Sequence, residues 1–520
     1  MSSELFWADQ EAERVISKRD DKDSYVCAAG ITPSGPKHIG NFREIITVDL
    51  IVRALKEKGK SVRFIYSWDS YDRFRKVPAE VPGNKRSLMK EEIGKPVCDV
   101  VDPWGCHESW AEHWMTRLEQ EVAQTGIKPE YMRQHEFYRD CVYADAIKKA
   151  LNKIDEIKRV LNKYRSKPLS DKWQPIFLYC EKCLKDSTRI TGYDGDYGLA
   201  YECDCGYSDA IDFREKGLVK LKWRVDWPMR WAYHGVDFEP AGKEHMVEGS
   251  SRTTGVEIVK EVFGEQPPYG FMYGLIGRKG GAGKMSASKG NVVFVSDALE
   301  VYLPEVLRYL FVGNRPTADF TISFDEDVLK IYDDFYRCEA AYYDKAEGLS
   351  DKRAANLKRI YELSNLDPPG SMPLQLSFRT AALIAQTADK KKWVNRVKKL
   401  EKVSEGDEPR VKSLLERAAK WVGDYAPEKY RLVVNETVPS LKIDSKVKKA
   451  LRALGDYLLK EKPSLDSLNK KVFELAKSVG VKKFFKAAYQ VILSKSQGPK
   501  LAPFIISAGR KRVGGLLKSV

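Results

Sequence analysis

The chain has 520 residues and a mass of 59.3 kDa, with 43% hydrophobic residues, and this length predicts several domains on a prior of roughly one per 100 to 200 residues. No apolar run approaches the ~20 residues needed to cross a bilayer, and 31% charged residues mark a water-facing surface, which excludes a membrane protein. Lysine and arginine number 89 against 74 aspartates and glutamates, so the net charge of +15 favours a polyanionic partner such as nucleic acid.

Charge alone leaves two interpretations open: a nucleic-acid-binding protein, or a lysine-rich surface that is only solvated. The first residues, MSSELFWADQEAE, have neither a basic start nor an apolar stretch, so we expect no export signal. Nine cysteines are an odd number, and several have metal-ligand spacing rather than the spread of a disulfide framework. These features predict a cytoplasmic protein in a reducing compartment.

The first elements predict a βαβ unit. Residues 25–30 (YVCAAG) indicate a short buried strand that runs into a turn rich in glycine and proline. From Phe42 onward apolar residues recur at steps of three and four, which predicts a helix that ends near Gly59. Residues 62–68 (VRFIYSW) predict the next strand. This order favours a parallel sheet that binds a nucleotide at the carboxyl end of its strands.

The rest of the chain divides by composition. Residues 73–219 are rich in cysteine, histidine, tryptophan and charged helices, and we interpret them as an insertion. The apolar and aromatic stretch 221–231, a helix at 254–263 and a strand at 271–276 continue the α/β alternation. Residues 326–520 contain few glycines and repeated amphipathic stretches, such as 413–422 and 446–459, which predict helices alone. The predicted domains are a Rossmann-like α/β domain with a parallel sheet (1–72 and 220–325), a zinc-binding insertion (73–219) and an all-α C-terminal domain (326–520).

The turn PSGPKHIGN has the composition of a phosphate-binding site. Glycines at a strand-to-helix turn let the backbone approach a triphosphate, and a helix N-terminus offers N–H donors and the positive end of its dipole. His38 can donate a hydrogen bond to a phosphate oxygen, although a histidine in such a turn is more often structural. The candidate ATP-binding residues of this turn are Pro33, Gly35, His38, Gly40 and Asn41.

A second candidate lies far downstream, in the segment KMSASKG that follows Gly280, Gly281 and Gly283. Its lysines suit a leaving pyrophosphate, because negative charge builds up on the β- and γ-phosphates as the α-phosphate is attacked. An ordinary surface loop would have the same composition. The candidate residues here are Lys284, Met285, Ser286, Ser288 and Lys289.

Together the two segments resemble the HIGH and KMSKS signatures of class I aminoacyl-tRNA synthetases, in the same order and structural context. Longer stretches, including CAAGITPSGPKHIGN, YSWDSYDRFRKVP and DPWGCHESWAEHW, resemble class I lysyl-tRNA synthetases over most of the first 300 residues. The resemblance implies that ATP activates lysine as an adenylate, with His38, Lys284, Lys289 and Mg²⁺ stabilising the transition state. Asn41 replaces the last histidine of HIGH, and Ala287 replaces the second lysine of KMSKS, so whether Lys289 supplies the missing amine is open.

A lysine substrate needs an apolar channel for its methylenes and an acidic partner for its ammonium group. Trp223 or Trp227 could line the channel, although most tryptophans of this stretch are better explained as core, and Asp226 or Asp69 could meet the charge. The resemblance further implies that residues 242–245 (GKEH) approach the adenylate ribose. It assigns four residues to the amino-acid site, namely Gly30, Thr32, Trp223 and His245. We add Asp69 as the acidic candidate.

Two groups of residues have the types and spacing of structural zinc sites. Cys180, Cys183, Cys203 and Cys205 form two close pairs, as tetrahedral zinc requires, and such a clamp would stabilise a small insertion without its own core. The second group contains Cys106, His107 and His113, with Asp102 or Cys98 as the fourth ligand. The DPxGCHxS stretch of the resembling family is a zinc ligand set and favours Asp102. With four protein ligands each, both sites are predicted to be structural.

The predicted partners are ATP, L-lysine and tRNA(Lys), and we expect a monomer. Lysine runs in the helical half, at 390–392, 398–399, 446–449 and 482–486, could contact an anticodon loop, although most of them are explained as solvated helix faces. Two alternatives remain open: an adenylate-forming ligase with a small acceptor, and a non-catalytic RNA-binding protein that retains a synthetase fold. Deletion of the helical half separates the first from a tRNA ligase, and amino-acid-dependent pyrophosphate exchange tests the second.

Overall fold

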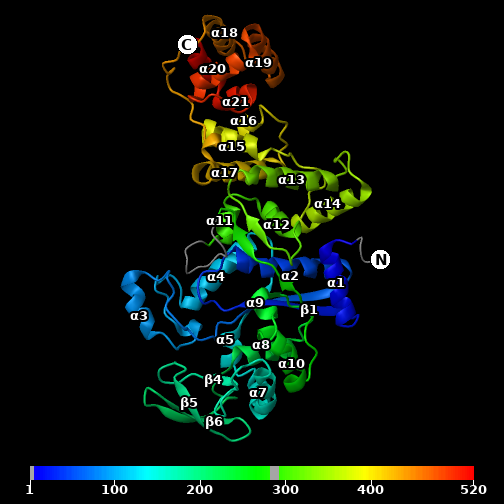
Figure 1. Cartoon of the computed structure of the whole chain (residues 1–520), viewed down its shortest axis with the longest axis vertical. Coiled ribbons are helices and arrows are strands. Elements are labelled where there is room, and N and C mark those ends of the chain that lie inside the picture. Colours follow the sequence, from blue (N-terminus) through cyan, green and yellow to red (C-terminus); the bar gives the residue numbers. More distant parts are fainter. Residues whose placement is uncertain (1–4, 281–291) are drawn as a thin grey trace. The chain divides into compact units, whose positions relative to one another are not determined.

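A computed structural model of the chain describes residues 5–280 and 292–520 (Figure 1). The chain forms two compact units, each described here by itself. The first unit contains residues up to Asp297 together with Arg308–Ile322, and the second contains Ala298–Leu307 and Ser323–Val520.

A parallel sheet lies at the centre of the first unit. Strands β1 (Ser24–Ile31), β2 (Ser61–Trp68) and β3 (Glu130–Arg133) pair in this order, and all are parallel. On the other side of β1, parallel bridges join Cys27 to Phe238 and Phe238 to Tyr269. The chain therefore adds β2 and β3 to one side of β1 and its later segments to the other, a reversal that leaves a crevice at the carboxyl ends of the strands.

Short strands extend this pattern and line the end of the sheet. Just beyond the two bridges, β9 (Ala241–Gly242) pairs in parallel with β10 (Met272–Tyr273). Further on, β11 (Ile276–Arg278) pairs in parallel with β12 (Phe320–Ile322). The predicted α/β fold with a parallel sheet is confirmed.

Helix α2 (Ile39–Glu57) connects β1 to β2 and completes the predicted βαβ unit. Thirteen of its residues are buried, because apolar side chains occupy nearly every position of its central turns. The backbone N–H of Lys58, at its C-cap, donates to Ala54, and Gly59 follows at φ 79°, a conformation that glycine adopts without strain. The helix therefore begins and ends close to where the sequence predicts.

The other helices of the first unit flank the sheet or belong to the segment between β2 and β8. The predicted helix at 254–263 is α10 followed by a π-helical turn at Val259–Phe263. These helices of the first unit are α1 (Trp7–Lys18), α3 (Arg86–Glu91), α4 (Trp110–Ala123), α5 (Gln134–Arg139), α6 (Ala144–Asn152), α7 (Ile154–Asn162), α8 (Trp223–His234), α9 (Lys243–Met246) and α10 (Ser251–Ile258). Two 3-10 turns lie at Gly83–Lys85 and Val97–Asp99.

Within residues 73–219, four strands lie apart from the central sheet. Strand β4 (Ile176–Leu178) pairs antiparallel with β8 (Val219–Leu221), the strand that precedes α8. Strands β5 (Thr188–Tyr193), β6 (Gly198–Cys203) and β7 (Ser208–Asp212) form an antiparallel sheet of their own. The same segment also supplies β3 to the central sheet, so it contains both a separate small sheet and one strand of the main one.

The second unit is helical from Ser323 to Val520, and all of these residues are described and none is in a strand. Its C-terminal helices enclose a hydrophobic core that includes Leu451, Phe484 and Leu517. Asp444 and Ser464 cap two of these helices through side-chain oxygens, which explains where they begin. The helices are α13 (Asp327–Tyr342), α14 (Asp351–Ser364), α15 (Phe378–Thr387), α16 (Trp393–Val397), α17 (Glu408–Asp424), α18 (Ser445–Lys460), α19 (Leu465–Val479), α20 (Val481–Leu493), α21 (Leu501–Ala508) and α22 (Arg510–Lys518).

The chain passes between the two units within α11 (Val295–Leu299), within α12 (Pro304–Val312) and just after β12, between Ile322 and Ser323. Among the helices of the described residues, none combines the length and apolar character that crossing a membrane requires.

Candidate active site and metal centres

The turn between β1 and α2 places His38 at the N-cap of α2. Its Nδ1 accepts a hydrogen bond from the backbone N–H of Gly40 at 3.0 Å, and its own backbone N–H donates to Oδ1 of Asn41 at 3.0 Å. A β-carbon at position 40 would lie 2.8 Å from the His38 ring, so glycine is needed there. Because Nδ1 accepts, Nε2 is the N–H donor of the neutral imidazole, at the positive end of the helix dipole. This geometry suits a phosphate oxygen.

The other residues predicted in this turn have local roles. Pro33 and Gly35 are buried within it, and the side chain of Asn41 is engaged by the backbone N–H of His38. All five predicted residues of the second signature, namely Lys284, Met285, Ser286, Ser288 and Lys289, lie outside the described residues. Soon after that segment, the carbonyl of Val293 accepts a hydrogen bond from the N–H of Ile39 at 2.8 Å. The chain that follows the second signature therefore lies beside the first one.

A cavity of about 400 Å³ opens at the carboxyl ends of β1 and β2. This is the crevice expected where strand order reverses in an open parallel sheet. The structure brings together at this cavity all five residues predicted for the amino-acid site. Of the turn before α2, Ser34 lines the cavity and His38 does not. The lining residues are Gly30, Ile31, Thr32, Ser34, Asp69, Asp72, Arg73, Phe74, Arg75, Lys76, Pro78, Val97, Trp223 and His245.

Aromatic rings form one wall of the cavity. The ring of Trp223 stacks on Trp227 with centroids 5.0 Å apart and planes 15° apart, and the His245 ring contacts both. The Nε1–H of Trp223 donates to Oγ of Ser251 at 3.0 Å, which fixes its orientation. Trp227 is buried in the hydrophobic core, so of the two tryptophans considered for a methylene channel Trp223 is the one that faces the cavity.

A buried network of charges lies at the base of the cavity. Arg230 binds Asp69 at 2.6 Å and Asp226 at 3.2 Å. Lys220 binds Asp72 at 3.0 Å and Asp226 at 3.3 Å. Asp226, which the sequence offered as a partner for a substrate ammonium, is only 1% exposed in its side chain and is already paired with both cations.

The pKa values of the two cavity carboxylates differ because their surroundings differ. Burial raises the pKa of Asp69 to about 7, although the charge of Arg230 opposes this shift. Burial also acts on Asp72, but the charge of Lys220 and a hydrogen bond from Thr32 Oγ1 at 2.7 Å hold its pKa below the usual value. Asp72, Lys220 and Arg230 were not singled out from the sequence.

Glu44 on α2 is a further acidic residue that sequence reasoning missed. Its Oε1 accepts from the backbone N–H of Gly30 at 3.2 Å, and its Oε2 accepts from the hydroxyl of Tyr273 at 2.7 Å. Burial raises the pKa of Glu44 to about 8 despite the Tyr273 hydrogen bond, and the nearby charges of Glu239 and Asp69 add to the shift. A carboxylate within the apolar stretch of α2 was the signal that could have revealed it.

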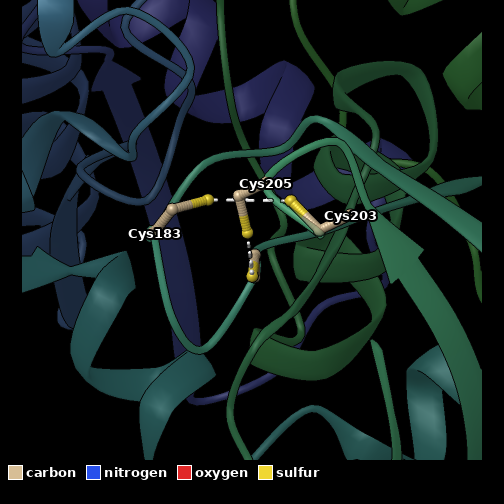
Figure 2. Close-up of side chains that lie close together, drawn as sticks. Cys183, Cys203 and Cys205 are labelled. Atoms are coloured by element: carbon tan, nitrogen blue, oxygen red, sulfur yellow. Dashed lines mark hydrogen bonds between the residues drawn. The ribbon is translucent and has the colours of Figure 1, made fainter. Parts of the chain in front are cut away.

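Four cysteine sulfurs lie together at the edge of the small β5–β6–β7 sheet. Figure 2 shows Cys183, Cys203 and Cys205 with their sulfurs directed toward one another. The Sγ atoms of Cys183 and Cys203 are 3.6 Å apart, and those of Cys180 and Cys205 are 3.7 Å apart. A tetrahedron of thiolates with Zn–S bonds of about 2.3 Å has edges of roughly 3.8 Å, so the group fits zinc. A hydrogen bond from the backbone N–H of Tyr207 lowers the pKa of Cys205 to about 7, which favours the thiolate.

A second group contains Asp102, Cys106, His107 and His113, whose ligand atoms lie within 4.8 Å of one another. The Sγ of Cys106 is 3.2 Å from Oδ2 of Asp102 and 3.2 Å from Nδ1 of both His107 and His113. Burial opposes the ionisation of Asp102, but N–H donors from Trp104, Cys106 and His107 lower its pKa. The structure places Asp102, and not Cys98, in this group.

Comparisons with known proteins identify the family of the chain. A family model described as tRNA synthetases class I (K) matches residues 5–367. The lysine–tRNA ligase of Thermococcus kodakarensis is 42% identical over 98% of both chains, and that of Treponema pallidum is 40% identical over 99% of this chain and 98% of its own. The lysine–tRNA ligase of Borrelia garinii subsp. bavariensis is 39% identical over 97% of both chains. With a cavity and signature turn placed as described, these matches show that the chain belongs to the class I (K) family of tRNA synthetases.

Proposed function

We propose that the protein is a lysine–tRNA ligase, which activates L-lysine with ATP and transfers it to the 3′ end of tRNA(Lys). The near-complete coverage of curated lysine–tRNA ligases at about 40% identity is the observation that carries this proposal. The cavity supports it, since it gathers the five residues predicted for the amino-acid site. The enzyme would act as a monomer in the cytoplasm, where translation consumes its product.

Adenylation would take place at the N-terminus of α2. The lysine carboxylate attacks the α-phosphorus of ATP, a new P–O bond forms, and the bond to pyrophosphate breaks. His38 Nε2–H would donate to a phosphate oxygen as its charge changes, and the positive end of the α2 dipole would add to this stabilisation. ATP would enter with Mg²⁺, which neutralises phosphate charge, and Lys284 and Lys289 would act on the pyrophosphate. The turn before α2 would be shaped for ATP by Pro33, Gly35, Gly40 and Asn41. The second signature would add Met285, Ser286 and Ser288 to the ATP site.

We assign the ε-ammonium of lysine to Glu44 rather than to Asp69 or Asp226. Both aspartates already pair with buried cations, whereas the hydrogen-bond donors that reach Glu44 are a backbone N–H and a tyrosine hydroxyl, which are neutral. A buried carboxylate whose pKa is about 8 gains most from a positive ligand, because the ligand offsets the cost of ionising it.

The position of Glu44 on α2 also fits the distal end of lysine. Glu44 is six residues after His38, which is about 9 Å along the axis of a helix that rises ~1.5 Å per residue. The α-ammonium and the reacting carboxylate of lysine share the α-carbon, while four methylenes separate the ε-ammonium from this carbon. Gly30 lines the cavity and its backbone N–H donates to Glu44 at 3.2 Å, so the carboxylate lies directly behind the cavity wall that Gly30 forms. Trp223 and His245 would cover the methylenes, and Thr32 would lie near the reacting end.

We also propose that both ligand groups hold structural zinc. The cysteine group joins β4, β6 and the turns around them, and the second group fixes the loop before α4. Four protein ligands in each group leave no coordination position for a substrate, so zinc would stabilise the fold rather than take part in the reaction.

Replacement of Cys183 by serine is expected to lower the zinc content of the purified protein from two ions per chain to about one. Serine keeps the size of the side chain but is a poor zinc ligand, so the small β5–β6–β7 sheet loses its clamp. Metal analysis measures the first effect, and faster proteolysis between residues 180 and 212 measures the second. His113→Ala, which alters the other group, is the matched control: it should lose the other ion and keep this segment protected. An unchanged zinc content in Cys183→Ser would contradict the assignment.

The charge distribution supports tRNA as the acceptor. Residues 431–520 contain twenty lysines and arginines against six acidic residues, so this short segment accounts for +14 of the net charge of +15. These residues include the bundle α18–α22, which has its own hydrophobic core. Positive charge on a helical surface suits the phosphates of a folded RNA, and we propose that this unit binds the anticodon arm.

The proposal is tested by offering the purified protein each of the twenty amino acids with ATP and total tRNA. Lysine-dependent pyrophosphate exchange and the formation of lysyl-tRNA are the expected results. Charging of a different amino acid would contradict the substrate. Exchange without transfer to tRNA would favour the ligase with a small acceptor, and the absence of exchange with any amino acid would favour the RNA-binding protein.

A further inference from the structure

Two exposed cations lie at the rim of the substrate cavity. Arg75 and Lys76 both line it, and their side chains are exposed. Among residues 5–280 and 292–520, neither has an ion-pair partner. Their neighbour Arg73 also lines the cavity, but it is paired with Asp186 at 3.1 Å. The rim therefore presents two positive charges without a direct ion pair to a described carboxylate, although Asp186, the partner of Arg73, is near enough for the charge of Arg75 to act on its pKa.

The interior of the cavity has the opposite character. Asp69 and Asp72 are the acidic side chains of its base, and three carboxylates, those of buried Asp69 and Asp226 and half-buried Asp72, share the two cations Lys220 and Arg230 there. An acidic interior suits a cationic amino acid, whereas a basic rim suits an anion. The cavity therefore has separate regions for two ligands of opposite charge.

Backbone hydrogen bonds hold the rim segment in place. The N–H of Phe74 donates to the carbonyl of Lys95 at 2.8 Å, and the N–H of Gly94 donates to the carbonyl of Phe74 at 3.0 Å. The N–H of Val97 donates to the carbonyl of Asp72 at 2.8 Å, and the Phe74 side chain is buried. Arg75 and Lys76 thus extend from a fixed backbone, which reduces the entropy lost when they bind a ligand.

We propose that Arg75 and Lys76 bind the phosphodiester backbone of the single-stranded 3′ end of tRNA where it enters the cavity. This inference rests on the proposed function. In acyl transfer the terminal ribose hydroxyl attacks the lysyl carbonyl carbon, the bond from this carbon to the AMP phosphate oxygen breaks with its electron pair leaving on AMP, and the hydroxyl proton passes to the departing phosphate. The terminal ribose must therefore reach the lysine inside the cavity, so the phosphates that precede it pass the rim, where two unpaired cations lie.

The test is the double variant Arg75→Gln/Lys76→Gln in the full-length enzyme, assayed for both lysine-dependent pyrophosphate exchange and tRNA charging. We expect kcat/KM of charging for tRNA to fall roughly 10- to 100-fold, because two phosphate contacts are lost, while the rate of pyrophosphate exchange stays the same. The slope of log kcat/KM against log salt should become shallower by about 1.4, since each contact to a single strand contributes about 0.7. Arg75→Lys, which keeps the charge, should restore most of the activity that Arg75→Gln loses.

Lys90→Gln is the matched control. Lys90 is an exposed cation of α3 in the same stretch of chain, it has no ion pair among the described residues, and it does not line the cavity. In Lys90→Gln the ratio of the tRNA-charging rate to the pyrophosphate-exchange rate should equal that of the unaltered enzyme. An unchanged ratio and salt slope in the double variant would overturn the inference, and so would a rise in KM for ATP that accounts for the whole loss. Failure of the unaltered enzyme to perform exchange with lysine would instead overturn the proposed function.

Discussion

Replacement of His38 by alanine is expected to slow lysine-dependent pyrophosphate exchange by about 10²- to 10³-fold, the usual cost of losing one donor to a developing charge. The imidazole lies at the N-cap of α2 with Nε2 as its N–H donor, so it can strengthen its contact as the α-phosphorus becomes pentavalent. KM for lysine should change far less, since the lysine side chain would bind elsewhere. Steady-state exchange kinetics measure both quantities.

His38→Asn separates this role from helix capping. Asparagine is a good N-cap residue and can accept the hydrogen bond from Gly40, but its short side chain does not place a donor where Nε2 lies. We expect this variant to keep the stability of α2 and to remain as slow as the alanine variant. Recovery of full exchange in His38→Asn would show that the histidine matters only for the helix.

Glu44→Gln is expected to raise KM for lysine by about 100-fold, because a charge-assisted hydrogen bond to the ammonium is replaced by a neutral amide. The amide oxygen of glutamine can still accept from the backbone N–H of Gly30, and its NH2 group can donate to the Tyr273 hydroxyl, so the fold around it is preserved. Tyr273→Phe, which keeps the carboxylate and removes one donor, should raise KM much less. Lysine titration in pyrophosphate exchange measures the effect.

The pH dependence of lysine binding provides a separate test of Glu44. Burial raises the pKa of Glu44 to about 8, so below this pH the carboxyl group is mostly protonated and must lose a proton to bind an ammonium. Free lysine keeps its ε-ammonium protonated over this range, since the ordinary pKa is ~10.4. KM for lysine should therefore fall as pH rises toward 8, by up to about tenfold per unit, and Glu44→Gln should remove this dependence. A dependence that survives in Glu44→Gln would return the assignment to Asp69, whose pKa is about 7.

The βαβ start of the fold could be predicted because its signals are local. The strand at 25–30, the apolar periodicity after Phe42 and the strand at 62–68 correspond to β1, α2 and β2 with bounds shifted by a few residues. The paired cysteines were also recognisable, because their spacing alone implies that the sulfurs can meet. Local spacing could not decide between Asp102 and Cys98, and the resemblance together with the structure favours Asp102.

The charged base of the cavity could not be predicted, because its members come from two stretches of chain that are far apart in the sequence, residues 69–72 and 220–230. Lys220 precedes α8, Asp226 and Arg230 belong to it, and Asp69 and Asp72 follow β2. Sequence separation hides which carboxylates already have partners, so Asp226 remained a candidate for the substrate although Lys220 and Arg230 neutralise it. Glu44 was missed for the converse reason, since an acidic residue on an apolar helix does not reveal which neighbour it faces.

Helix α2 has His38 at its N-cap and Glu44 in its second turn, and a rigid helix keeps the separation of these two side chains constant. An amino acid held at Glu44 by its terminal amine would present its carboxylate to the ATP α-phosphorus only if its chain has the right number of methylenes. Ornithine, one methylene shorter, would be held about 1 Å out of line, and a misplacement of this size costs about 100-fold in rate. The enzyme would thus distinguish homologous diamino acids by the length of one helical segment, with discrimination in kcat as well as in binding.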